Sequence, residues 1–350
     1  MIHRNRVTII DVARLAGVSK STVANVLNSP LGVPIQDVTR KRVLEAVAEL
    51  GYQKNALAAA FSSGRTNTIG ILLPQHHQEA TSRVYRQFGQ ELFTAVFDAA
   101  CEADLRVTSI PNWERDASIE ALNDRRVDGL ILASIRSRET VAAIYASGIP
   151  CVEISSGFGD HLVHPDNEGG IRQAIEHLVG LGHRRIAYYR GPLGDYFASE
   201  RRYNGFVDAC QTYRLSPDEC PVLLARVEVT AQLELPLGQR PTAVLTFNDS
   251  QASIVYDMAQ ALGLSVPDDL SVVGFDNSLI AELIRPGLTT IDNALADQAR
   301  GAVARLMTLW KRDFAGLPVS EAGDQNTMTP LRIPTRLVVR QSTGRVPKGV

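Results

Sequence analysis

The sequence has few cysteines and no long apolar run, and both absences narrow the class of protein. Four cysteines occur among 350 residues, and no two of them have the Cys-x-x-Cys spacing of a zinc or redox motif. No apolar stretch approaches the roughly 18 residues of a membrane-spanning helix, and the polar N-terminus lacks the apolar segment of a secretion signal. We therefore expect a cytoplasmic protein without a membrane partner, with buried thiols in a reducing compartment.

The chain also lacks the short motifs that carry nucleotide binding and catalysis. No G-x-G-x-x-G follows the first expected strand of its β/α part, and neither a P-loop nor a nucleophile elbow is present. His76 and His77 are adjacent, but no carboxylate or cysteine stands at ligand spacing, so we expect an exposed loop there. These absences argue against an enzyme, and we expect no cofactor and no metal.

Charge is nearly balanced overall but unevenly distributed. The formal net charge is −2, yet residues 1–65 contain nine Lys or Arg and four Asp or Glu, a net of +5, which leaves −7 in the rest. A small basic head on an acidic body predicts that a polyanion binds the head alone. With 45% apolar residues, a chain of this length is expected to form two or three globular domains.

The basic head has the pattern of three short helices. Thr8 and Asp11 have the spacing of a capping box before the first helix. Ser19 can cap a second helix over residues 20–27. A third helix is expected over about 38–50, where apolar residues recur at helical spacing. The head is therefore predicted to be a small all-α domain.

The first two of these helices have the features of a helix-turn-helix. Gly17 permits the tight turn between them, and apolar residues of both helices can form a miniature core. Polar residues then face outward from the second helix, the part that meets base edges in this class. These candidate base-reading residues are Lys20, Ser21 and Asn25. A helical hairpin inside a larger fold has the same pattern, but the basic charge and terminal position favour DNA binding.

From Ile69 onward, apolar strands alternate with helices. Strands are expected at 69–74, 127–133, 149–154, 185–189, 243–247 and 271–274. Helices are expected at 88–103, 140–147, 170–181, 200–212 and 250–262. Unbroken alternation predicts parallel, doubly wound sheets. Because the pattern restarts near residue 163, we expect two lobes. Between the expected strands at 185–189 and 243–247, no full helix is expected over residues 222–240.

The head resembles that of the LacI/GalR family of bacterial regulators. Residues 8–28 read T-I-I-D-V-A-R-L-A-G-V-S-K-S-T-V-A-N-V-L-N, against the family pattern T-x-x-D-V-A-x-x-A-G-V-S-x-x-T-V-S-x-V-L-N. Further similar segments follow in the family's order over nearly the whole chain, among them Gly182-His183-Arg184, Asn248-Asp249 and Gly274-Phe275-Asp276.

The resemblance implies an α/β protein in which an all-α head and a hinge helix precede a core of the periplasmic-binding-protein type I kind, with two doubly wound parallel lobes. The implied divisions are 1–53 for the DNA-binding domain, 54–66 for the hinge helix and linker, 67–343 for the effector-binding core and 344–350 for a short tail. Within the core, an N-lobe comprises about 67–164 with 291–320, and a C-lobe about 165–290 with 321–343.

The resemblance further implies a homodimer that binds a near-palindromic operator. A small effector in the core cleft, a sugar or another small polar metabolite, would control it allosterically. The family's habit predicts a repressor acting at the nucleoid, although the sequence does not distinguish repression from activation. No leucine heptads follow the core, so we expect a dimer rather than a tetramer. A transport protein would instead need a secretion signal and no basic head.

The resemblance also assigns roles within the head. At the base-reading positions, Lys20 can donate to guanine, Asn25 can pair bidentately with adenine, and Ser21 is permissive. Positions that correspond to DNA backbone contacts are Thr8, Ser19, Thr22, Asn28, Thr39, Tyr52 and Asn55. Thr8 and Ser19 are equally explained as helix caps, and Tyr52 by simple packing.

The hinge helix corresponds to residues 55–61, with Ala58 and Phe61 at the minor groove. Phe61 stands where the family usually has leucine, and both are apolar residues that can pry open a base step. Ala24 stands where the family usually has serine, so one hydroxyl that can reach a phosphate is missing.

Effector-binding positions are matched in the core. The candidates are Arg202, Asn248, Asp276, Gln75 and Asn293. Guanidinium, amide and carboxylate groups at strand ends suit hydroxyl-rich or anionic ligands. For Asn248 a loop-capping role is an equal alternative, and Asp249 is expected to cap the helix that follows it. Residues 222–240 lack the aromatic that often stacks on a sugar in this family.

Overall fold

The computed structural model describes residues 7–28, 35–53, 60, 64–73, 82–110, 122, 124–135, 137–191, 197–310, 329–347 and 349. The chain folds as two units, Met1–Thr66 and Asn67–Val350.

Among its described residues, the first unit has three helices, α1 (Ile9–Ala16), α2 (Lys20–Asn28) and α3 (Asp37–Leu50). Thr8 caps α1, because its hydroxyl accepts from the Asp11 amide at 3.4 Å while the Asp11 carboxylate accepts from the Thr8 amide at 2.9 Å. Gly17 ends α1 with φ at +63°, a conformation that favours glycine. All three helices contribute to a small core of Val12, Ala13, Ala16, Val23, Val26, Val43 and Ala46.

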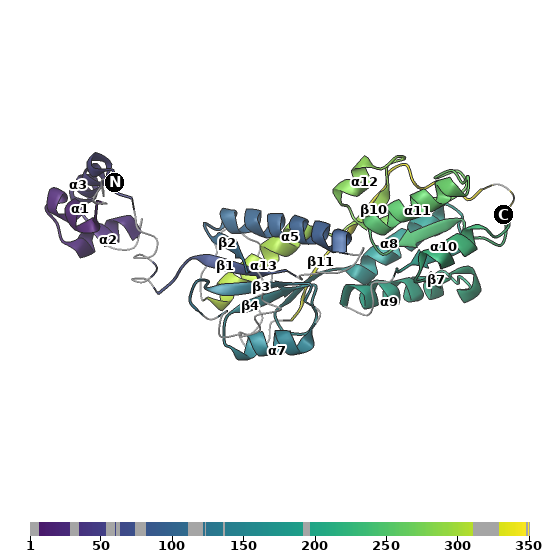
Figure 1. The fold of residues 1–350 in the computed structure, drawn as a ribbon, viewed down its shortest axis with the longest axis horizontal. Helices are drawn as coiled ribbons and strands as arrows, with labels where there is room; N and C mark the ends of the chain where they lie inside the picture. The colour runs from purple at the N-terminus through teal and green to yellow at the C-terminus, as the bar shows by residue number, and fades with distance from the viewer. Residues whose placement is uncertain are drawn as a thin grey trace. The chain divides into compact units, whose positions relative to one another are not determined.

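The described residues of the second unit form two six-stranded sheets. In the first sheet the strand order is β11 (Leu331–Ile333), β5 (Leu162–Pro165), β4 (Cys151–Ile154), β3 (Gly129–Ala133), β1 (Thr68–Leu72), β2 (Arg106–Ser109). All pairs in it are parallel. One face packs on α5 (Ser82–Glu102) and α13 (Leu295–Leu309), and the opposite face on α7 (Arg138–Ala146) (Figure 1).

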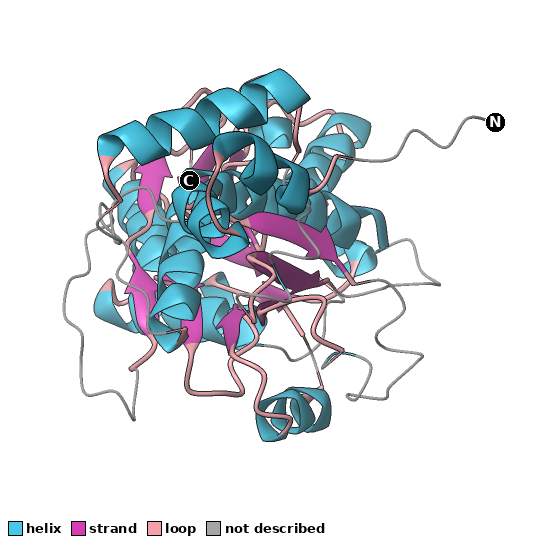
Figure 2. Cartoon of the chain, turned by 90° about the vertical axis from the view of Figure 1, so that its left-hand side faces the viewer, coloured by secondary structure: helices cyan, strands magenta, loops and turns pink. Residues whose placement is uncertain are grey.

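The second sheet has the order β12 (Arg336–Val338), β10 (Thr289–Asp292), β9 (Ser271–Asp276), β8 (Ala243–Thr246), β6 (Ile186–Tyr189), β7 (Val222–Leu223). Only the β10–β12 pair is antiparallel among the described strands. One face packs on α8 (Asn167–Gly180) and α9 (Phe197–Thr212). The other packs on α10 (Arg226–Leu233), α11 (Asp249–Ala261) and α12 (Leu279–Leu283). A short 3-10 helix spans Pro217–Glu219. Strands thus lie between helices, as a doubly wound fold requires (Figure 2).

The chain passes between the two sheets three times, after β5, after β10 and after β11. This differs from the expected lobe boundaries. Residues 291–320 were assigned to the first lobe and 321–343 to the second, but β10 extends to Asp292 in the second sheet, and β11 lies in the first. A three-residue strand has too little periodicity to be assigned from sequence. Leu331 and Ile333 pack against the first core, which places β11 there.

The expectation that residues 222–240 lack a full helix is wrong. They form β7 and the eight-residue helix α10. Glu228, in the first turn, stabilises the start of this helix, since its carboxylate accepts from the backbone amides of Leu224 at 2.6 Å and Ala225 at 3.3 Å. Val229 and Leu233 anchor it in the core.

None of the helices in the described ranges is both long and apolar enough to cross a membrane.

Candidate DNA-binding and effector-binding sites

The start of α2 is fixed by Ser19. Its hydroxyl accepts from the Thr22 amide at 3.1 Å and lies 2.7 Å from the Ser21 hydroxyl and 2.8 Å from the Thr22 hydroxyl. Ser19 therefore caps α2, as predicted, and the capping hydroxyl remains exposed. A hydroxyl at a helix N-terminus can also meet a phosphate, because the helix dipole and free amides favour anions there.

One side of α2 is polar and uncovered within the head. Val23 and Val26 are buried in the small core, whereas Lys20, Ser21 and Asn25 are exposed. The three predicted base-reading residues are therefore accessible. Their side chains offer an ammonium group, a hydroxyl and an amide, the groups that read base edges in a major groove.

The predicted backbone contacts differ in exposure. Thr8 is exposed, and Thr22 and Thr39 are partly buried. Tyr52 packs partly against the core of the head, so the packing explanation holds for at least part of its ring. The Asn28 side chain lies outside the described residues. So do Asn55, Ala58 and Phe61 of the predicted hinge.

In the second unit, polar residues gather where the strands of the second sheet end. Asp276 is the last residue of β9, Asn248 follows β8, and Asn293 directly follows β10. These three strands are parallel neighbours, so their carboxyl ends meet at one edge of the sheet. Ligands of open α/β sheets bind outside this edge.

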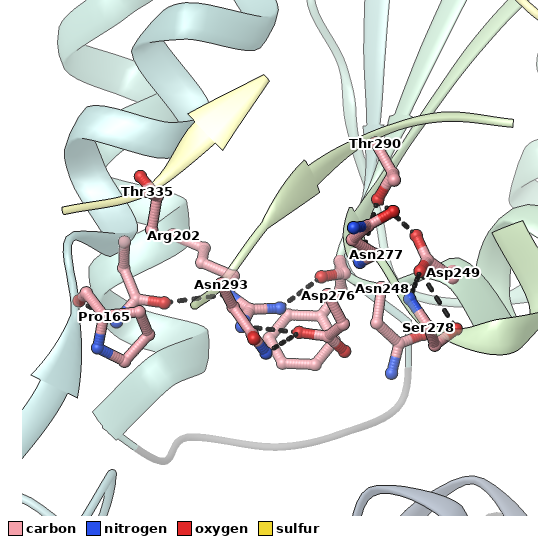
Figure 3. Close-up of polar contacts among 12 residues, drawn as sticks. Pro165, Arg202, Asn248, Asp249, Asp276, Asn277, Ser278, Thr290, Asn293 and Thr335 are labelled. Carbon is pink, nitrogen blue, oxygen red and sulfur yellow. Dashed lines mark hydrogen bonds and ion pairs between the residues drawn. The ribbon is translucent and has the colours of Figure 1, made fainter. Parts of the chain in front are cut away.

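Arg202 reaches the same edge from α9, and each side of its guanidinium has a partner. Its Nε donates to Asn167 Oδ1 at 2.9 Å, and Nη2 donates to Asp276 Oδ1 at 3.2 Å (Figure 3). The Phe275 ring lies 3.6 Å and the Phe247 ring 4.4 Å from the guanidinium carbon. Two aromatic faces and fixed acceptors thus hold this cation in place. Asn167 was not predicted as part of the site.

Asp276 is the meeting point of the cluster. Its Oδ1 accepts from both Arg202 and the Asn293 amide, the latter at 3.1 Å. Burial raises the pKa of Asp276, while Arg202 opposes this rise. Gln298 donates to the Asn293 carbonyl at 2.7 Å and so fixes the segment that carries Asn293. The structure therefore brings together three predicted effector residues, Arg202, Asp276 and Asn293.

Asn248 has one of its two predicted roles, that of a cap, whereas Asp249 does not cap the helix as expected. The Asn248 side chain accepts from the Gln251 amide at 2.9 Å and caps α11. Asp249 was expected to cap this helix, but its carboxylate instead bonds to Ser278 and Thr290. Adjacent Asn and Asp are both good capping residues, so sequence does not indicate which one caps.

Gln75, the fifth predicted effector residue, lies outside the described residues, and so do His76 and His77. Within the described part of the chain, no cluster of three or more His, Cys, Asp or Glu has the geometry of a metal site.

Each of the two units matches a known protein family. Residues 8–55 match the bacterial regulatory proteins of the lacI family, and residues 175–343 match the periplasmic binding protein-like domain. The HTH-type transcriptional regulator DegA of Bacillus subtilis is 31% identical over 97% of this chain and 98% of its own. Catabolite control protein A of Priestia megaterium is also 31% identical, over 96% of this chain and 99% of its own. The chain belongs to the LacI family.

Among solved structures, the fold of this LacI-family chain is similar to that of the Lac repressor dimer bound to operator and the anti-inducer ONPF. The TM-score is 0.73 at 26% identity, over 97% of this chain and 100% of that one. As a member of the LacI family, the protein is a DNA-binding transcription regulator with a periplasmic-binding-protein-like core. Its relatives are regulators and not enzymes.

Proposed function

We propose that the protein is a transcriptional repressor that binds a near-palindromic operator as a homodimer and is controlled by a small polar effector in its core. The observation that carries this proposal is the likeness over 97% of the chain to a Lac repressor dimer bound to operator and a small anti-inducer. The proposal places the protein in the bacterial cytoplasm, at the nucleoid.

In the head, Lys20, Ser21 and Asn25 read bases. The exposed face of α2 supports this role, because a recognition helix needs polar side chains that its own domain leaves uncovered. Backbone contacts come from Thr8, Ser19, Thr22, Asn28, Thr39, Tyr52 and Asn55. Ala58 and Phe61 of the hinge enter the minor groove.

In the core, Arg202, Asp276 and Asn293 bind the effector, with Asn248 and Gln75 beside them. Guanidinium and amide groups donate, while the carboxylate accepts, and this combination suits the paired hydroxyls of a sugar or a similar polyol. Because Asp276 already pairs with Arg202, the cluster offers no large excess of positive charge, which favours a neutral effector over a strong anion.

Selection of binding sites from random DNA tests the first half of the proposal. The expected result is a near-palindromic site whose two halves match one head each, placed near one helical turn apart or a multiple of it. A reporter gene controlled by that site should be expressed more strongly when the regulator is deleted. Lower expression after deletion would instead identify an activator.

A thermal-shift screen of sugars, sugar acids, purines and nucleosides tests the second half. A compound at a hundredfold excess over its Kd should stabilise the protein by roughly 2.7 kcal/mol. The stabilising compound should also change operator affinity. A compound that stabilises the protein without any effect on operator binding would contradict allosteric control.

A further inference from the structure

Asp249 is a buried carboxylate whose hydrogen bonds go to the segments around Asp276. The residue is only 1% exposed. Its Oδ2 accepts from the Ser278 amide at 2.7 Å and the Ser278 hydroxyl at 3.0 Å, and its Oδ1 accepts from the Thr290 hydroxyl at 2.5 Å (Figure 3). Ser278 stands two residues after Asp276. A side chain of α11 therefore anchors the turn that follows β9.

This turn has an unfavourable backbone conformation. The φ angles are 111° at Asp276 and 54° at Asn277, a region that residues other than glycine rarely adopt. Such a conformation persists only where surrounding contacts impose it. The Asn277 amide donates to Thr290 Oγ1 at 3.4 Å, and the same hydroxyl donates to Asp249. Without the buried carboxylate, the turn is expected to relax and to rotate the Asp276 side chain away from Arg202.

The neighbouring strand leaves room for this carboxylate. A Cβ added to Gly274 of β9 would lie 2.2 Å from Asp249 Oδ1, closer than real contacts allow. A glycine is thus needed at this point of the strand for Asp249 to reach the turn. Because Asp249 is remote from solvent, its interactions with the turn are not weakened by competing water.

The charged groups near Asp249 come from three directions. Burial raises the pKa of Asp249, and the nearby Asp276 carboxylate of β9 raises it further, to about 7. Arg202 of α9 pairs with Asp276, and Arg340 donates to the Asn277 side chain at 2.8 Å. An ionised carboxylate accepts stronger hydrogen bonds than a neutral one, so the anchor is strongest when Asp249 is charged.

We propose that Asp249 is a positioning residue of the effector site, which fixes the turn Asp276–Ser278 so that the Asp276 carboxylate faces the ligand. Its relevance to effector binding rests on the proposed function. The anchoring itself is a property of the unliganded protein, and it can be measured without knowledge of the effector.

Hydrogen–deuterium exchange of the full-length, unliganded protein at pH 6 and pH 8 tests the proposal, after correction for intrinsic exchange rates. Peptides that contain the Ser278 amide report on the turn. In the wild type, corrected exchange there should be about fivefold faster at pH 6 than at pH 8. Asp249→Asn keeps an acceptor but no charge, so its turn should exchange at the faster rate at both pH values. Asp249→Ala should exchange fastest.

The matched control is Asp257→Asn, which removes an exposed carboxylate from the same helix and should behave as the wild type. Peptides from α8 report whether each variant is folded. If Asp249→Ala does not fold, the exchange of the turn in the wild type and in Asp249→Asn still tests the proposal. The proposal is overturned by turn exchange that is the same in wild type and Asp249→Asn at pH 8.

A compound found in the thermal-shift screen provides the link to function. At pH 8 its Kd should be weaker in Asp249→Asn than in the wild type by a similar factor. Equal Kd values of the two proteins at pH 8 would contradict a role of Asp249 in presenting Asp276 to the ligand. If no compound binds at all, the proposed effector site fails, while the exchange experiment still decides whether Asp249 positions the turn.

Discussion

At the scale of single residues, the exposed amide of Asn25 on α2 is suited to read one base pair. An asparagine can donate to and accept from adenine at once, which no other base satisfies equally. Asn25→Ala should therefore weaken operator binding by about 1–3 kcal/mol and relax the preference at one position of each half-site. Titration of the selected operator and its single-base variants measures both effects. An equal loss of affinity on every variant would make Asn25 a backbone contact instead.

Asp276 allows a matching test in the core. Removing its side chain would leave the buried Arg202 without its carboxylate partner. Breaking a buried ion pair in this way destabilises proteins by about 3–5 kcal/mol, so Asp276→Asn is the better change. The amide still accepts from Arg202 but binds a ligand hydroxyl without a charge. We expect the binding free energy of a compound from the screen to become about 1.5–3 kcal/mol less favourable, as measured by calorimetry.

Asp208→Asn is the control for this change, because Asp208 is an exposed carboxylate on α9, the helix that carries Arg202. Equal affinities of Asp276→Asn and Asp208→Asn would place the effector elsewhere.

Sequence predicted which residues lie together where β9 and β10 end, but not which contacts each of them makes. Arg202, Asp276 and Asn293 were expected and lie together. The anchoring role of Asp249 was not foreseen, because the same Asn-Asp pair fits a cap in either order. Only the tertiary contact with Ser278, 29 residues away in the sequence, distinguishes the two.

At the scale of elements, the cap of α2 lies where DNA is expected. Ser19 accepts from the Thr22 amide, and loss of such a cap costs about 1 kcal/mol. Ser19→Ala should therefore lower the stability of the head by this amount. Ser19→Asp should preserve the cap, because aspartate also caps helices well, but its charge should repel a phosphate and weaken operator binding.

Thermal unfolding and operator titration of the two variants separate the capping and phosphate roles. If Ser19→Asp binds the operator as well as the wild type does, Ser19 is a cap only.

The accuracy with which elements were predicted follows the strength of their local signals. The head helices have a capping box, a turn glycine and apolar periodicity, and α1 to α3 lie where expected. By contrast, α10 depends on Glu228, whose reach back to the amides of Leu224 and Ala225 was overlooked. Strands β10 to β12 are three or four residues long, and their pairing is set by distant partners. Contacts that distant in sequence leave no local pattern to detect.

At the scale of the whole molecule, the proposed control by an effector requires coupling between the core and the head. The three crossings between the sheets are where such coupling can arise, and two of them are joined, because the Thr335 hydroxyl donates to the Asp166 carbonyl at 3.0 Å. Asn293 and Asn167 stand next to two of the crossings. A ligand held by Arg202, Asp276 and Asn293 would therefore lie close to segments that connect the two sheets.

The proposed function also requires a dimer, since one head alone would contact only half of a near-palindromic operator. In α12, Leu279 and Leu283 are 60% and 65% exposed and stand one helical turn apart on one face. Two exposed leucines on one helix face can form part of an interface, and in the proposed homodimer the partner is a second copy of the chain.

Leu283→Glu should therefore dissociate the dimer by burying a charge without a partner. Light scattering should give about twice the chain mass of 38.1 kDa for the wild type and a single chain for the variant. Operator affinity should fall when the dimer dissociates, because two linked heads bind at a high effective concentration and separate heads do not. Leu237→Glu is the control, since Leu237 is 47% exposed but lies outside α12. A Leu283→Glu protein that remains dimeric would place the interface on another surface.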